Sequence, residues 1–175
     1  MRALRRLLGI DSELSTAASD TATVRRIAAT LDALPPAEAR YLAAFAYVLA
    51  RVARADLEIS SAESEQMIRL VREFSTLSEA QALLVVQLAK TQAIALGGTE
   101  NYLVTRQFKE ISNSAQRVDL LRCLFAVAAA DQTISHVENS EITAIGLEIG
   151  LRAEEVASIR AAYRDQLSVL KDLPK

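Results

Sequence analysis

Two aspartates stand at the same point of a repeated phrase, and no other residues of the chain are better placed to do chemistry. Asp56 lies in the stretch ARADLEIS and Asp131 in AAADQTIS, each directly after an alanine-rich apolar run. Such a run predicts a helix. The C-terminal end of a helix carries partial negative charge, so a carboxylate there is placed unfavourably. We therefore expect each aspartate to have a compensating partner.

Two interpretations of that partner stay open. In the first, each carboxylate accepts hydrogen bonds from the following loop in an Asx turn that joins two helices. In the second, the carboxylate, the free carbonyls of the helix end and the nearby Glu58 form an oxygen-rich corner for a hard cation such as Ca²⁺ or Mg²⁺. A standard EF-hand loop is excluded, because a loop beginning at Asp56 has Ser61 in place of its glycine and Met67 in place of its bidentate glutamate.

Helix capping explains the serines and isoleucines of the phrase. A serine followed three residues later by glutamate or glutamine is a capping box, in which each side chain accepts a backbone N–H of the other residue. Each box stabilises its helix by about 1 kcal/mol. An apolar residue just before the cap staples the incoming chain to the helix. The boxes are Ser60/Glu63, Ser78/Gln81 and Ser135/Glu138, and the staple residues are Ile59 and Ile134.

The similarity between the two copies extends well beyond the repeated phrase. The offset between the aspartates is 131 − 56 = 75 residues, and at this offset the chain matches itself over a longer window. We interpret the two copies, at about 41–95 and 116–170, as repeats of a helix, turn and helix unit. The identical pairs include Leu49/Leu124, Val52/Val127, Ala53/Ala128, Ala55/Ala130, Ile59/Ile134, Ser60/Ser135 and Glu63/Glu138.

Composition and periodicity predict an all-α fold. Hydrophobic residues make up 51% of the 175 residues, with only 5 Gly and 3 Pro, which favours helix over strand. We predict a compact bundle of about seven to eight helices made of two related helical halves. The predicted helices include 24–34, a central alanine-rich helix from 36 to 55, and 153–167. We assign residues 21–175 to a single domain and residues 1–20 to an N-terminal amphipathic and polar segment.

Several function classes lose support at this level. The formal net charge of −2 argues against a nucleic-acid partner, which requires a basic surface. The chain has one cysteine, Cys123, and one histidine, His136, so no nucleophile and base can be paired and we expect no enzyme. A hydrolase would need a pocket that combines carboxylates with an oxyanion site. The unpaired Cys123 in an apolar run fits a reducing, cytoplasmic compartment.

Basic residues suggest two surface features. Arg51, Arg54, Arg69 and Arg72 are interpreted as a solvated helix surface, and His136 as a solvated residue at a helix start. The N-terminal stretch MRALRRLLGI is a short amphipathic segment. It either docks on the domain or touches an anionic surface, which would place the protein at the periphery of the inner membrane. No window has the length of a transmembrane helix.

The doubled Asp-x-x-Ile-Ser-x-x-Glu phrase in an all-helical chain resembles the tellurite-resistance TerB family and its TerB-like relatives. Those proteins typically carry Ala-Asp-Gly-Glu-Ile-x-x-x-Glu in each half, and the resemblance covers about residues 41–163. This chain departs from the pattern. Leu57 and Gln132 replace the glycines, and Thr133 replaces the second glutamate, which leaves the second half one carboxylate short.

The resemblance implies a non-enzymatic bacterial module linked to resistance to tellurite and other stresses. It also implies a divalent cation of the Ca²⁺ or Mg²⁺ class held by acidic residues. We expect such a module to act by binding a protein partner. The alternative is a purely structural all-α adaptor or membrane-proximal scaffold without metal, for which a homodimer is one expected form. Carried over by position, the metal ligands are Asp56, Glu58 and Glu63 in the first half and Asp131 and Glu138 in the second.

Overall fold

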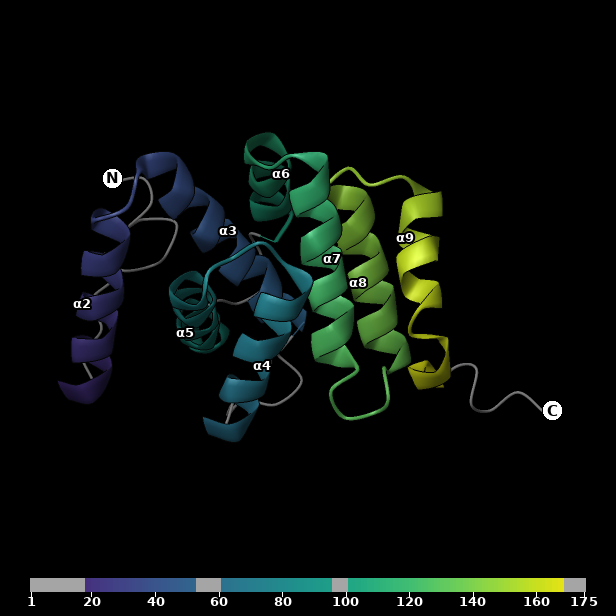
Figure 1. The fold of residues 1–175 in the computed structure, drawn as a ribbon, viewed down its shortest axis with the longest axis horizontal. Coiled ribbons are helices and arrows are strands. Elements are labelled where there is room, and N and C mark those ends of the chain that lie inside the picture. The colour runs from purple at the N-terminus through teal and green to yellow at the C-terminus, as the bar shows by residue number, and fades with distance from the viewer. Residues whose placement is uncertain (1–17, 53–60, 96–100, 169–175) are drawn as a thin grey trace.

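The computed structural model describes residues 18–52, 61–95 and 101–168, and within these ranges every regular element is a helix. The predicted all-α class is confirmed (Figure 1). The helices are α2 (Ala18–Asp32), α3 (Pro36–Val52), α4 (Ser61–Phe74), α5 (Glu79–Ala95), α6 (Asn101–Ile111), α7 (Ser114–Ala128), α8 (His136–Glu148) and α9 (Ala153–Ala161), followed by the 3₁₀ turn η2 (Arg164–Gln166).

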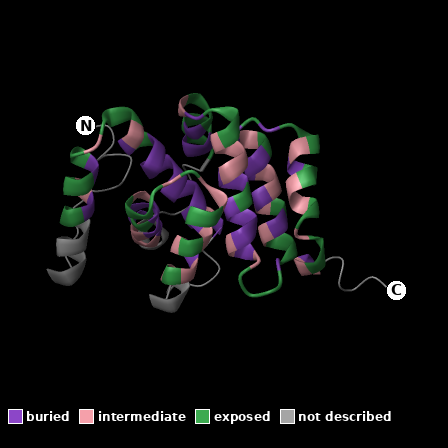
Figure 2. Cartoon of the chain, in the orientation of Figure 1, coloured by how far each residue is buried: buried purple, intermediate pink, exposed green. Residues whose placement is uncertain are grey.

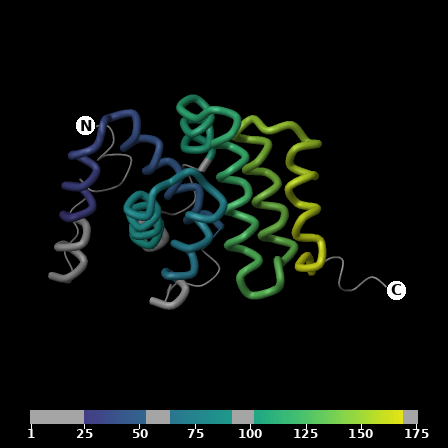
Figure 3. Tube along the Cα trace, in the orientation of Figure 1, coloured from purple at the N-terminus to yellow at the C-terminus, as the bar shows by residue number. Residues whose placement is uncertain are grey.

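The helices pack in chain-local hairpins around one central helix. In Figure 3 the trace passes along α7, returns along α8 and turns again into α9, so that these three helices lie side by side. Helix α4 packs on the free side of α7, and α5 packs on α4 and α3 (Figure 1). Helix α3 contacts α2, α5, α6, α7 and α8, and it therefore joins the N-terminal helices to the C-terminal ones.

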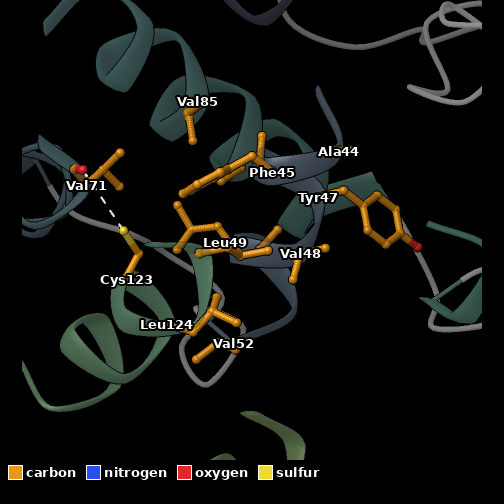
Figure 4. Close-up of a cluster of buried hydrophobic side chains, with 14 of the residues drawn as sticks. Ala44, Phe45, Tyr47, Val48, Leu49, Val52, Val71, Val85, Cys123 and Leu124 are labelled. Carbon is orange, nitrogen blue, oxygen red and sulfur yellow. Dashed lines mark hydrogen bonds between the residues drawn. The ribbon is translucent and has the colours of Figure 1, made fainter. Parts of the chain in front are cut away.

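Helix α3 is central because its sequence has no polar face in its middle. Every residue from 41 to 50 is buried (Figure 2). Four of these ten residues are alanines, whose small side chains let neighbouring helices approach from several sides. Figure 4 shows the result near the middle of the molecule, where Phe45 and Leu49 of α3 lie among Val71 of α4, Val85 of α5 and Leu124 of α7.

Two helix boundaries differ from the prediction. Helix α2 begins at Ala18, six residues before the predicted start, because its first turns are formed by small and polar residues without apolar periodicity. Helix α9 ends at Ala161, whereas the predicted helix runs to 167. There the chain passes through η2, and Leu167 then pairs with Ile134 in a parallel β-bridge. This tertiary contact outweighs the helical periodicity of the segment.

The interpretation of Arg51 as a solvated surface residue is wrong. Its side chain is only 7% exposed, and its guanidinium binds two carboxylates of α8. Nη2 lies 2.6 Å from Oε1 of Glu141, and Nη1 lies 3.1 Å from Oε2 of Glu148. The last turn of α3 is thus tied to the middle and to the C-terminal end of α8. Arg69 and Arg72 are exposed, as predicted.

Some predictions fall outside the described residues. They concern the N-terminal amphipathic segment, Arg54, and the first-half phrase with Asp56, Glu58, Ile59 and Ser60. Glu63 lies in α4, but its side chain is not among those described. None of the helices in the described ranges has the length and apolar character required to cross a membrane.

We expect Arg51→Met to lower the free energy of unfolding by about 1–3 kcal/mol, because it strips two part-buried carboxylates of their charged partner. Denaturant unfolding measures the change. Arg106→Met is the matched control, since Arg106 forms an exposed i,i+4 pair with Glu110, and its loss should cost less than about 0.5 kcal/mol. Equal effects of the two substitutions would contradict a structural role for Arg51.

Gly146 permits the close approach of α7, α8 and α9. A Cβ at this position would lie 2.8 Å from Cγ2 of Val156 and 3.2 Å from both methyl groups of Leu121. The contacted Val156 methyl is attached next to the backbone and has little freedom to move. The glycine is therefore required by packing, although it lowers the intrinsic stability of the helix.

We expect Gly146→Ala to destabilise the protein by about 1–2 kcal/mol, because overpacking exceeds the gain in helix propensity. The thermal midpoint and denaturant unfolding measure this change. Ser140→Ala, at an exposed position of the same helix, should change the free energy of unfolding by less than about 0.5 kcal/mol. A Gly146→Ala variant as stable as the parent would show that α7 and α9 can move away at little cost.

Candidate acidic turn

The second copy of the repeated phrase forms the turn between α7 and α8, residues 129–134. Helix α7 ends at Ala128, and the N–H of Ala129 donates to the carbonyls of Phe125 and Val127. The N–H of Gln132 then donates to the carbonyl of Ala129 and closes the turn. Gln132 has φ of 62°, in the left-handed region that favours glycine.

The predicted capping box at the start of α8 is confirmed. The N–H of Glu138 donates to Oγ of Ser135 at 3.2 Å, and the N–H of Ser135 donates to Oε2 of Glu138 at 2.8 Å. The Ser78/Gln81 box is confirmed as well. Glu138 consequently has a structural role at the helix start, and one of its two oxygens is already engaged.

A contact that the sequence did not indicate holds the other side of the turn. The N–H of Ile134 donates to the carbonyl of Gln166 at 2.7 Å, and the N–H of Ser168 donates to the carbonyl of Ile134 at 3.0 Å. The side chains of Ile134 and Leu167 are both buried. No local signal marks this pairing, because the two segments are more than 30 residues apart.

Asp131 is exposed at the outside of this turn. Its carboxylate accepts no hydrogen bond from any residue that the structure describes, so those residues do not form the Asx turn of the first interpretation. The backbone hydrogen bonds of the turn run between main-chain groups instead. Asp131 is therefore a solvated carboxylate without a hydrogen-bond partner in the described part of the chain.

The described half does not complete a metal site by itself. Among the residues that the structure describes, no three His, Cys, Asp or Glu side chains come together as a possible ligand group. A Ca²⁺ ion takes six to eight oxygen ligands, whereas this turn offers Asp131, the second oxygen of Glu138, backbone carbonyls and water. The predicted ligands Asp56 and Glu58 lie outside the described residues, and so does the side chain of Glu63.

The left-handed backbone at Gln132 explains why the TerB pattern has a glycine at this position. The pattern has glycine at this position, and glycine adopts positive φ without steric cost. Glutamine at the same φ carries a cost of about 1–2 kcal/mol. The turn of this chain therefore has a left-handed residue that is not the glycine best suited to it.

The remaining titratable groups near the core offer no nucleophile. Burial raises the pKa of the Cys123 thiol to about 12, and the nearby Asp119 carboxylate adds to the rise. Burial also raises the pKa of Tyr41, with smaller contributions from Asp119 and Cys123. The pKa of Asp119 is raised by burial and lowered in part by Arg122. His136 is exposed at the first position of α8, as predicted, and Cys123 is protonated at neutral pH.

The helix order and the acidic turn at a capped helix junction define a class of protein, an all-helical module without a recognisable reaction centre in the part described. Residues 42–161, well over half of the chain, match the family model described as tellurite resistance protein TerB. The chain belongs to the TerB family. No curated protein and no solved structure gives a significant match. Helix α2 and the bridge residues Gln166 to Ser168 lie outside the matched range.

We expect Ser135→Ala to lower the free energy of unfolding by about 1 kcal/mol, because it removes the cap of α8. Glu138→Gln should cost less than about 0.5 kcal/mol, because a glutamine oxygen accepts the same N–H. Chemical denaturation of both variants checks the pair. If Glu138→Gln proves as costly as Ser135→Ala, the charge of Glu138 and not its hydrogen bond stabilises the helix start.

Proposed function

We propose that this protein is a non-enzymatic TerB-family module of a bacterial tellurite- or stress-resistance system. It binds a protein partner through its acidic helix–helix turns, with a divalent cation of the Ca²⁺ or Mg²⁺ class between module and partner. A fold alone does not define a function. The proposal is carried by Asp131, an exposed carboxylate with no hydrogen bond from the described residues, on a turn that the structure holds firmly.

The firmness of the turn supports a binding role. Ordering a loop on binding costs free energy, and a turn that is already ordered avoids this cost. The capping box fixes Ser135, and the β-bridge fixes Ile134 at the end of the turn that carries Asp131. Asp131 is thus presented to a partner at a defined position, although it contributes no hydrogen bond to the fold.

The ligand set supports weak cation binding. Asp131 carries a full carboxylate, whereas Glu138 brings only the oxygen that the cap leaves free. A site with few charged ligands binds Ca²⁺ with a Kd on the order of 10⁻⁴–10⁻³ M. Oxygens from a partner, or from Asp56, Glu58 and Glu63 of the first half, would complete the coordination and raise this affinity.

The electrostatics of the core support a non-enzymatic role in a reducing compartment. The single thiol, Cys123, is fully buried and protonated at neutral pH, so it is neither a nucleophile nor a partner in a disulfide. We place the protein in the cytoplasm on this ground, because unpaired thiols persist there.

A structural adaptor without metal is the second candidate, and α6 supports it. Tyr102 and Leu103 are adjacent on this helix and are 64% and 60% exposed. Large apolar side chains with this exposure are common in protein contact surfaces. The occupant of such a surface would be a partner protein or a second copy of the chain, and no ion would be needed.

Titration of Ca²⁺, Mg²⁺, Mn²⁺ and Zn²⁺ into the chelator-treated full chain tests the proposal by heat of binding and by Tm. An ion at tenfold to hundredfold excess over its Kd stabilises the folded state by about 1.4–2.7 kcal/mol. For a chain of this size, that corresponds to a rise in Tm of about 3–10 °C. We expect Asp131→Asn and Asp56→Asn each to reduce the rise.

Asp32→Asn is the matched control, because Asp32 is an exposed acid at the end of α2, outside the residues that match the family. It should leave both the heat and the Tm shift unchanged. An ion concentration of 10 mM is about tenfold the weakest expected Kd. The absence of any heat or Tm shift up to this concentration would exclude the cation and favour the adaptor. An equal loss in all three variants would show unspecific charge binding.

A further inference from the structure

The acidic turn and the chain after α9 meet in the one β-bridge found among the described residues. Ile134 contributes both backbone groups, its N–H to the carbonyl of Gln166 and its carbonyl to the N–H of Ser168. The buried side chains of Ile134 and Leu167 add an apolar contact on either side of these hydrogen bonds. Residues 164–168 thus hold the turn from outside the α7–α8 hairpin.

Two costs are located at this same joint. Gln132 has a positive φ that a residue with a side chain rarely adopts. Oε1 of Gln166 is buried and accepts no hydrogen bond from the part of the chain that is described. Separation of the two segments would free Gln132 to relax to negative φ and would let water reach the Gln166 amide, so both costs would fall.

The gains of closure are also localised. Separation breaks the two hydrogen bonds of Ile134 and exposes Ile134 and Leu167, but it leaves the ladder of α7 and α8 intact. A joint with local gains and local costs opens at a lower free energy than the whole fold. Backbone strain and an unpaired buried acceptor at one place are typical of a conformational switch.

We propose that residues 164–168 form a releasable latch on the α7–α8 turn, residues 129–134. In the closed state the latch holds Gln132 in the left-handed conformation and fixes the neighbouring Asp131. In the open state the turn relaxes, and Asp131 loses its defined position. A ligand that binds the closed turn therefore favours closure; this last step depends on the proposed function.

Residue-resolved hydrogen exchange of the full chain, followed by NMR, tests the latch. The amides of Ile134 and Ser168 are the donors of the bridge and report its opening, whereas the amide of Leu124, inside α7, reports global unfolding. We expect the amides of Ile134 and Ser168 to have equal protection factors, at least about tenfold lower than that of the Leu124 amide. Protection of all three amides at the same level would overturn the latch.

Two substitutions should move the latch in opposite directions. Gln132→Gly removes the φ cost of the closed state and should slow exchange at Ile134 and Ser168 about fivefold. Its control, Gln132→Ala, removes the same side chain but keeps the cost, so it should not slow exchange. Leu167→Ala should speed exchange at both amides at least about tenfold, and at Leu124 by the same factor, because the closed state is destabilised relative to the open and the unfolded states alike.

Gly146→Ala disturbs packing between α7, α8 and α9 that the open state keeps, so it should speed exchange at Leu124 and leave Ile134 and Ser168 unchanged. Acceleration of exchange at Ile134 and Ser168 together with Leu124 in Gly146→Ala would show that all three amides exchange through global unfolding and would overturn the latch.

Repeating the exchange measurement with 10 mM Ca²⁺ or Mg²⁺, about tenfold the weakest expected Kd, tests the latch and the proposed cation site independently of each other. Slower exchange at Ile134 and Ser168 in the presence of ion supports both. Exchange that responds to Gln132→Gly and Leu167→Ala but not to ion supports the latch and overturns its control of a cation site. Saturable ion binding with exchange only through global unfolding overturns the latch and leaves the cation site standing.

Discussion

The burial of α3 is the constraint on which the rest of the structure depends. A helix that is apolar on every side through its middle cannot lie at a surface, so other helices must cover it all around. Its alanines bring α5, α6, α7 and α8 close to its axis. The same burial carries Arg51, in its last turn, into a shielded position against α8. Two carboxylates of α8 pair with this guanidinium. The N-terminal and C-terminal helices are thereby joined by ion pairs as well as by apolar contacts.

The residues of the α7–α8 junction differ in how far they are engaged by the rest of the fold. Ile134, Ser135 and Glu138 are each engaged, by burial, by capping and by the bridge to residues 166–168. Asp131 has no such engagement among the described residues. A carboxylate just after the C-terminal end of a helix is unfavourable for stability, so Asp131 contributes little to the fold that the other residues of this turn stabilise.

The turn departs from the TerB pattern at its left-handed residue. The pattern residue at position 132 is glycine, which suits the left-handed backbone, and this chain has glutamine there. The bridge from Ile134 to Leu167 supplies local stabilisation close to this strained residue. Residues 166–168 lie outside the range that matches the TerB family model. The support for the turn thus comes in part from a segment that the family match does not include.

The sequence by itself determined the helical class, the central position of α3, the capping boxes at Ser78 and Ser135, and the place of Asp131 at a helix junction. These features depend on periodicity and on contacts within a few residues, which a linear pattern records directly. Only the tertiary structure decided that Arg51 is shielded by Glu141 and Glu148, that α9 ends at Ala161, and that Leu167 pairs with Ile134. Each of these joins segments at least 30 residues apart, and their partners are chosen by the packing of helices around α3, which no local pattern in the chain encodes.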